Sequence, residues 1–157
     1  MSFEVVLIRL SVATLIGCLI GLNRELYGKP AGMRTHALVA LGAALITVAS
    51  LDLAGKDSAA VLRTVQGIMA GIGFLGAGVI LRDESNHSVH GLTTAASIWV
   101  VAALGISCGA GQWAISMVAF ALILILLVFG EKLEQKLRLK NCPPPEAPMR
   151  RNQAPLV

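Results

Sequence analysis

The sequence predicts an all-α integral membrane protein, built as a bundle of about five transmembrane helices. Hydrophobic residues make up 55% of the 157 residues and charged residues only 14%. Soluble domains carry about 25% charge, so this chain cannot cover a water-facing surface. Five apolar stretches approach the roughly 20 residues that cross a bilayer, and they leave no room for a soluble catalytic domain. The predicted spans are 5–22, 36–54, 65–81, 93–109 and 112–130.

The first apolar stretch is expected to be an uncleaved span. A signal peptide needs a positively charged segment before its apolar run and a small-residue cleavage site after it. Here the preceding segment contains Glu4 and no basic side chain, and Asn23, Arg24 and Glu25 follow the run. Neither flank fits a signal peptide.

Basic residues predict the orientation, because positive charge collects on the cytoplasmic side of a membrane. Ten of the thirteen Lys and Arg residues fall after span 1, after span 3 or in the C-terminal tail. The N-terminus is therefore expected outside and the C-terminus in the cytoplasm. Residues 1–130 are expected to form the transmembrane domain. Residues 131–157 are expected to form a cytoplasmic basic helix and a disordered, proline-rich tail.

The third span is unusual in its glycine content, with five glycines in residues 67–78. Lipid enforces a helix there because the backbone must satisfy its own hydrogen bonds, and glycine allows close helix contact. We expect this span to be the packed centre that holds spans 1, 2 and 4 together. The glycines expected to mediate helix packing are Gly17, Gly21, Gly67, Gly71, Gly73, Gly76 and Gly78.

Two further features concern the edges of the bundle. Residues 122–129 are bulky on every face, so span 5 is expected at the periphery, facing lipid. Arg9 lies near the outer end of span 1. Its side chain either enters the bundle or snorkels to the interface, and we favour snorkelling.

No catalytic, cofactor or metal site is predicted. Residues 71–76 match G-x-G-x-x-G, but a dinucleotide site needs a preceding strand and a soluble βαβ unit, which an apolar span does not provide. The cysteines form no CxxC pair, and His87 and His90 lack the further ligands of a zinc site. We therefore expect that the protein is not an enzyme and uses no cofactor.

Two polar segments are the best candidates for function, one around the turn between spans 1 and 2 and one before span 4. Two interpretations stay open. The charged helix ends either anchor cytoplasmic turns, or they form a vestibule that binds an anion, a lipid head group or a protein partner. Glu25 is expected to pair with Arg24 or Arg34, and Thr93 or Thr94 to cap span 4. The candidate residues are Asn23, Arg24, Glu25, Arg34, Thr35, His36, Arg82, Asp83, Thr93 and Thr94.

Three blocks in order, within residues 24–36, 71–80 and 91–99, resemble the MgtC/SapB family of bacterial membrane proteins. The resemblance implies a five-span protein of the bacterial cytoplasmic (inner) membrane. It also implies a link to magnesium limitation and acid stress and, in pathogens, to survival inside host cells. The family's namesake carries a soluble ACT-like C-terminal domain, which this chain is expected to lack after Gly130.

Two functions are compatible with these features. The first is a non-enzymatic modulator of another membrane complex, and the resemblance implies the proton-translocating ATP synthase as one candidate. The second is a channel or transporter for an ion or small solute. Magnesium favours carboxylate ligands, and no Asp or Glu lies in the interior of a predicted span. The expected partners are the lipid bilayer, such a complex and a second copy of this chain. Nucleic acid is not expected.

Overall fold

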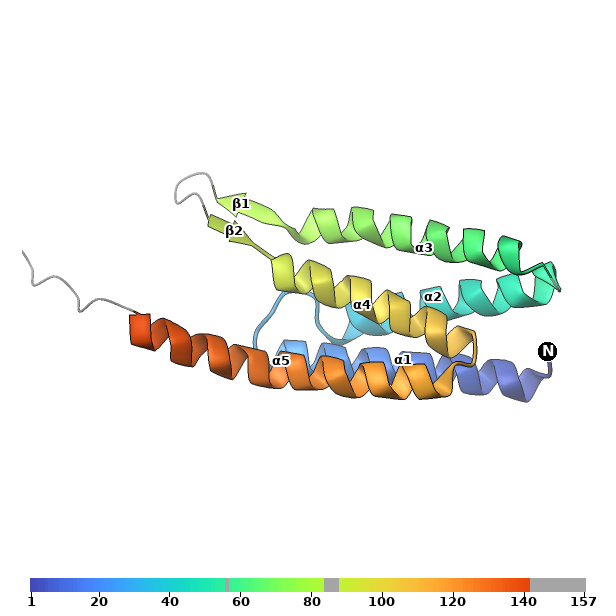
Figure 1. The fold of residues 1–157 in the computed structure, drawn as a ribbon, viewed down its shortest axis with the longest axis horizontal. Coiled ribbons are helices and arrows are strands. Elements are labelled where there is room, and N and C mark those ends of the chain that lie inside the picture. The colour runs from blue at the N-terminus through green and yellow to red at the C-terminus, as the bar shows by residue number, and fades with distance from the viewer. Residues whose placement is uncertain (56, 84–87, 142–157) are drawn as a thin grey trace, which may run out of the picture.

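The computed structural model describes residues 1–55, 57–83 and 88–141, with side chains described outside 81–88 and 131–141. Five helices and one short hairpin run in chain order (Figure 1). All five helices are long and apolar enough to cross a membrane, so the predicted fold class is confirmed. The elements are α1 Phe3–Leu26, α2 Met33–Ala54, α3 Ser58–Val79, β1 Leu81–Asp83, β2 Ser88–His90, α4 Leu92–Gly109 and α5 Trp113–Asn141.

The bundle has two distinct ends (Figure 1). The α1–α2 loop and the β1–β2 hairpin lie together at one end, which we call the hairpin end. The N-terminus, the α2–α3 turn and the α4–α5 turn lie at the other end. This arrangement gathers the basic loops after spans 1 and 3 at a single end.

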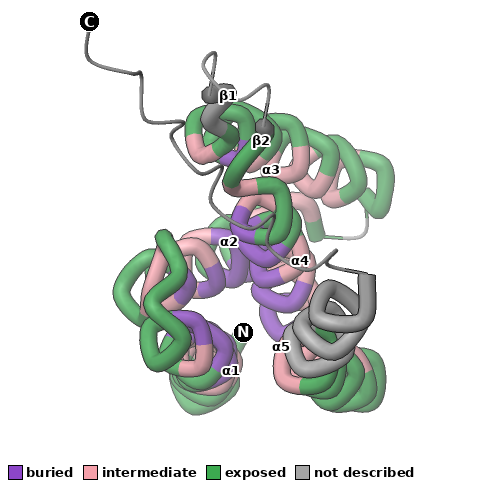
Figure 2. The backbone as a smooth tube through the Cα atoms, turned by 90° about the vertical axis from the view of Figure 1, so that its left-hand side faces the viewer, coloured by how far each residue is buried: buried purple, intermediate pink, exposed green. Residues whose placement is uncertain are grey.

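Small residues let α1, α2 and α4 pack closely, and most of the buried backbone in Figure 2 belongs to these three helices. A Cβ atom added at Gly17 would lie 2.6 Å from the carbonyl oxygen of His36 on α2. A Cβ atom added at Gly105 of α4 would likewise collide with the carbonyl oxygen of Ala40 on α2. Gly17 therefore lies where α1 and α2 approach each other most closely in this region. The core that results contains Ala13, Ile16, Ile20, Ala40, Ala44, Val101, Leu104 and Cys108.

The glycine-rich helix α3 lies at the edge of the bundle, which contradicts the expectation that it forms the packed centre. Only 6% of the α3 span is buried, against 50% of the α4 span. A Cβ atom added at Gly67, Gly71, Gly73 or Gly78 would meet no other atom within 4 Å. Within the described chain, these four positions face open space.

The physical reason is that α4 takes the central place. Its small residues lie on several faces, and it packs against α1, α2, α3 and α5. Helix α3 contacts this core through one side. There, a Cβ atom added at Gly76 would lie 3.6 Å from the Cβ atom of Ala95 on α4. The predicted peripheral position of the fifth span is confirmed, since only 6% of it is buried.

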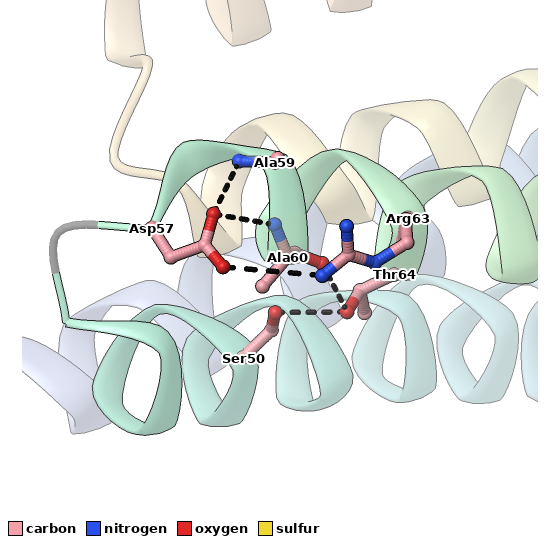
Figure 3. A network of polar contacts seen from close by, with 6 residues as sticks. All are labelled: Ser50, Asp57, Ala59, Ala60, Arg63 and Thr64. Carbon is pink, nitrogen blue, oxygen red and sulfur yellow. Dashed lines mark hydrogen bonds and ion pairs between the residues drawn. The ribbon is translucent and has the colours of Figure 1, made fainter.

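The α2–α3 turn is fixed by a polar network (Figure 3). Asp57 caps α3 by accepting hydrogen bonds from the backbone N–H groups of Ala59 and Ala60, at 3.0 and 3.1 Å. Such a cap satisfies N–H groups that the first helical turn cannot. One turn further along, the hydroxyl groups of Ser50 and Thr64 lie 2.9 Å apart and link α2 to α3.

Arg9 bonds to the end of α4, a contact that the expectation of a snorkelling side chain did not include. Its Nη1 donates to the carbonyl oxygen of Gly109 at 2.8 Å, at the C-terminal end of α4. Helix C-termini expose carbonyl groups and attract positive charge. The guanidinium also occupies the space beside Gly111, where a Cβ atom would lie 2.7 Å from Nη2. Arg9 therefore joins α1 to the α4–α5 turn.

Two features at the hairpin end were not predicted in this form. Strands β1 and β2 pair antiparallel, with Leu81 opposite His90 and Asp83 opposite Ser88. The predicted cytoplasmic helix is a direct continuation of span 5, since α5 runs unbroken to Asn141. The predicted domain boundary at residue 130 thus falls inside a helix, and the predicted disordered tail lies outside the described residues.

Candidate functional site

A cavity of about 620 Å³ opens at the hairpin end of the bundle. The end of α1 and the loop after it form one wall, and β2 with the start of α4 forms a second. The middle of α5 contributes Leu126, Leu127 and Gly130. The two polar segments predicted from the sequence therefore line one common space.

Basic side chains line part of this cavity. Arg24 and Lys29 line it together with His90, and none of its described lining residues is acidic. Helix α4 also begins here, after Gly91 in a left-handed conformation with φ of 89°. Gly91 itself has no side chain that could cap this helix end, and the Ala95 N–H donates to the Gly91 carbonyl at 2.8 Å. The positive end of the α4 dipole therefore faces the same region.

A buried chain of hydrogen bonds begins at the floor of this cavity. Arg24 donates from Nη2 to Thr94 Oγ1 at 2.6 Å, joining α1 to α4. Ser97 Oγ donates to the Thr94 carbonyl at 2.8 Å and lies 3.1 Å from His36 Nε2, joining α4 to α2. Relative exposures of 3% for Arg24 and 0% for His36 show that the chain is shielded from the surroundings.

The local sequence explains why a charged residue is buried here. A Cβ atom at Gly21 would lie 2.6 Å from Met33 Cα, so the end of α1 lies directly against the start of α2. The connecting loop then folds back, with the Lys29 N–H donating to the Arg24 carbonyl at 3.0 Å. This close approach at Gly21 carries Arg24 under the loop and beside α4.

The hydrogen-bond chain constrains the protons on His36. The Gly32 carbonyl can only accept, so His36 Nδ1, 3.0 Å away, must carry a hydrogen. If the ring is neutral, Nε2 has no hydrogen and can only accept one from the Ser97 hydroxyl. Ser97 has a single hydroxyl proton, so it then cannot donate to the Thr94 carbonyl. If the ring is protonated, Nε2 donates to Ser97 and Ser97 donates to Thr94. The neutral and protonated states of His36 therefore differ in whether Ser97 donates a hydrogen bond to the Thr94 carbonyl of α4.

The structure separates the remaining predicted residues. Asn23 and Thr93 line the cavity beside Arg24. Arg34 and Thr35 are exposed and line a different surface cavity of about 640 Å³, formed by residues of the α1–α2 loop and the start of α2. Arg82 and Asp83 lie in β1, and their side chains are outside the described set.

Two detailed expectations for this region were wrong. Neither Arg24 nor Arg34 forms an ion pair with Glu25 among the described contacts, and the Glu25 carboxylate accepts the Met33 backbone N–H at 3.0 Å. This bond satisfies a free N–H at the start of α2. Thr93 and Thr94 do not cap α4, because the N-cap residue is Gly91 and both threonines are already inside the helix.

Ser97 is the site residue that sequence reasoning missed. It lies three residues after Thr94 in the same helix, which places both side chains on one face. This spacing was the signal in the sequence that could have pointed to Ser97. Only the position of His36 on α2 shows that the Thr94–Ser97 face of α4 is polar and buried. The described residues contain no group of three His, Cys, Asp or Glu side chains that could hold a metal ion.

Comparisons with known proteins agree with this architecture. The family model described as MgtC family matches residues 10–136. The chain is 44% identical to SrpB of Synechococcus elongatus over 137 residues, which cover 81% of this chain and 75% of that protein. It is 42% identical to SapB of Bacillus subtilis, covering 82% of this chain and 56% of SapB.

A third relative is MgtC of Salmonella typhimurium strain LT2, which is 40% identical over 83% of this chain and 54% of its own length. The chain thus spans about half the length of SapB and MgtC. No solved structure matches the chain. The family model covers most of the sequence and all five spans, and the chain belongs to the MgtC family.

Proposed function

We propose that this protein is a non-enzymatic modulator of another membrane complex, acting in magnesium and acid-stress homeostasis. We place it in the bacterial cytoplasmic membrane, with the N-terminus outside and the hairpin end in the cytoplasm. The observation that carries the proposal is the outer face of α3. This face is defined by the exposed small residues Gly67, Ala70, Gly71, Gly73, Ala77 and Gly78.

The outer face of α3 has the composition of a helix–helix interface. Lipid-facing surfaces usually carry bulky apolar side chains, as α5 does with Leu122, Leu126 and Phe129. In lipid, helices associate chiefly through close packing, and glycine or alanine allows another backbone to approach. Phe74, which is 82% exposed, stands among these small residues as a projecting contact.

The same face continues into an apolar groove of about 670 Å³ between α2 and α3. Leu38, Gly42 and Ile46 line it from α2, while Gly67 and Gly71 line it from α3. A transmembrane helix of a partner can lie in such a groove with its side chains against both helices. The MgtC-family resemblance makes the membrane sector of the proton-translocating ATP synthase the first partner to test, and a second copy of this chain is the alternative.

The core packing favours a modulator over a permeation path. Backbone carbonyls of α2 meet glycines of α1 and α4 at the limit of close approach. The described residues offer no acidic cluster inside the bundle that would replace the water ligands of magnesium.

The test introduces bulk at the outer face of α3. Gly71→Leu should leave the yield, helicity and membrane insertion of the protein unchanged, because the added side chain projects into open space. It should abolish co-purification with the ATP synthase and growth support at low magnesium. Ala121→Leu on the exposed face of α5 is the matched control and should retain both. Full activity and full capture by Gly71→Leu would reject docking through α3.

A channel or transporter is the second candidate. The Escherichia coli relative YhiD has a provisional name as a magnesium transporter. In this chain, the polar bonds from Arg24 to His36 lead from the cavity into the helix bundle. Flux of magnesium, protons or anions through liposomes that contain only the purified protein would support this candidate. Flux no greater than in empty liposomes would support the modulator.

A further inference from the structure

We propose that His36 is a proton-binding site, and that a proton bound there locks α2 to α4 at the hairpin end of the bundle. The site consists of the imidazole ring, the Ser97 hydroxyl and two backbone carbonyl oxygens, those of Gly32 and Thr94. Its ligand is the proton itself, and proton binding does not depend on docking at α3.

The chain of contacts around His36 needs more hydrogens than a neutral ring provides. Gly32 O lies 3.0 Å from His36 Nδ1, Nε2 lies 3.1 Å from Ser97 Oγ, and Ser97 Oγ lies 2.8 Å from Thr94 O. Each of these three contacts needs one hydrogen, and the carbonyl oxygens at both ends supply none. A neutral ring and a hydroxyl supply two hydrogens, whereas a protonated ring and a hydroxyl supply three. Only the protonated state satisfies all three contacts at once.

The groups of this chain are enclosed, so a missing hydrogen bond is not simply replaced by one to bulk water. His36 is 0% exposed and Ser97 is 6% exposed. With a neutral ring, one contact brings two acceptors together without a hydrogen between them. A positive charge on a buried ring is itself costly. The additional hydrogen bond, made by a charged donor, offsets part of this cost.

Among the described side chains, charged groups reach this end of α2 mainly from α1 and the loop after it. Arg24 of α1 is buried, bonds to α4 and carries the same sign as a protonated ring. Helix α4 contains no acidic or basic side chain, and Arg63, the only one in α3, lies at the other end of the bundle. The other charged side chains of this region are exposed, namely Glu25, Lys29 and Arg34. Imidazole is the side chain whose ordinary pKa lies between about 5 and 8, so His36 is the group of the chain that changes charge on mild acidification.

Proton binding at His36 also affects a surface of α2. Leu38 and Val39, in the next turn of α2, line the apolar groove between α2 and α3. The charge state of His36 therefore sets how firmly one wall of this groove is held against α4. Regulation of partner docking by pH would follow, and this consequence rests on the proposed docking at α3.

NMR spectroscopy of the purified full chain in non-ionic detergent, with 15N-labelled histidine, tests proton binding directly. The ring of His36 should change from one protonated nitrogen at about pH 8 to two protonated nitrogens at about pH 5. The Thr94 carbonyl 13C signal should shift at the same midpoint, because the charge state of His36 decides whether Ser97 donates to it. His36→Gln identifies the His36 signals among the three histidines and should abolish the shift at Thr94.

A pair of variants at Ser97 tests whether the hydrogen-bond chain holds the proton. Ser97→Ala leaves the second ring N–H of a protonated His36 without its partner. The proton affinity of His36 should fall about tenfold, which moves the midpoint by about one pH unit. Ser97→Thr keeps the hydroxyl and is the matched control, with an expected change below about twofold. Helicity and elution volume will show that both variants fold.

Two results would overturn the proposal. One is a folded protein in which His36 keeps a single ring proton down to about pH 5. The other is an equal midpoint in the wild-type chain and in Ser97→Ala, which would show that the hydrogen-bond chain does not hold the proton. Both measurements use the isolated chain, so neither bears on docking at α3, which Gly71→Leu tests separately.

Discussion

The glycines of α1 and those of α3 occupy opposite environments, although both helices are apolar and both present small residues at helical spacing. Gly17 and Gly21 are buried where α1 contacts α2, and an added Cβ atom would lie 2.6 Å from backbone atoms there. Gly67, Gly71, Gly73 and Gly78 face open space. A glycine stripe thus shows that a close approach is possible, but it does not tell whether the partner belongs to the same chain.

The largest expected effect is at the α1 contact. Gly17→Leu would push a branched side chain into the backbone of His36 and Ala37 on α2. Overpacking of this kind should destabilise the fold by about 3 kcal/mol, the upper end of the usual range, seen as a large loss of monodisperse protein and a lower melting temperature in detergent. Gly42→Leu is the control, because that position of α2 faces open space. Equal stability of the two variants would contradict the contrast between packed and open glycines.

The second prediction concerns the interior polar groups that accompany the packed glycines. Ser97→Ala removes the hydroxyl between His36 and the Thr94 carbonyl. We expect a loss of about 1 kcal/mol in unfolding free energy, because buried hydrogen bonds within membranes are individually modest. Ser97→Thr keeps the hydroxyl and is the control. A stability change in Ser97→Ala no larger than in Ser97→Thr would show that the chain of bonds does not stabilise the bundle.

A smaller effect is expected at the polar bridge between α2 and α3. Ser50→Ala removes the hydrogen bond to Thr64, which joins α2 to α3 away from the core. The melting temperature should fall only slightly, corresponding to roughly 0.5 kcal/mol. Hydrogen exchange should rise in α3 and not in α1. An equal rise in both helices would mean that α3 is as firmly integrated as α1.

The smallest effect on stability is expected at the outer face of α3. Gly73→Leu should change the unfolding free energy by no more than about 0.5 kcal/mol, the usual range for surface substitutions. It also replaces a poor helix former by a good one. Thermal unfolding of the isolated protein checks this. Misassembly of Gly73→Leu would instead restore the idea that α3 glycines hold the bundle together.

The candidate site was predictable in part. Arg24, His36 and Thr94 were recognisable because charged or polar groups at the ends of apolar spans are costly without a partner. The pairing of these residues was not predictable, since Ser97, which links His36 to the α4 backbone, reads in the sequence as one more small residue. Glu25 was assigned to the wrong partner, because opposite charge is visible in a sequence while a free N–H at the start of α2 is not.

The sequence by itself determined five spans, their approximate limits and the collection of basic loops at one end. Those properties follow from the partition of each segment between water and lipid, which acts on segments separately. Only the tertiary structure decided that α4 is central, that α3 is peripheral and that Arg9 reaches the end of α4. Most of the surface of these helices is apolar, as lipid is, so hydrophobicity alone does not select the buried face, and shape complementarity between particular neighbours decides it.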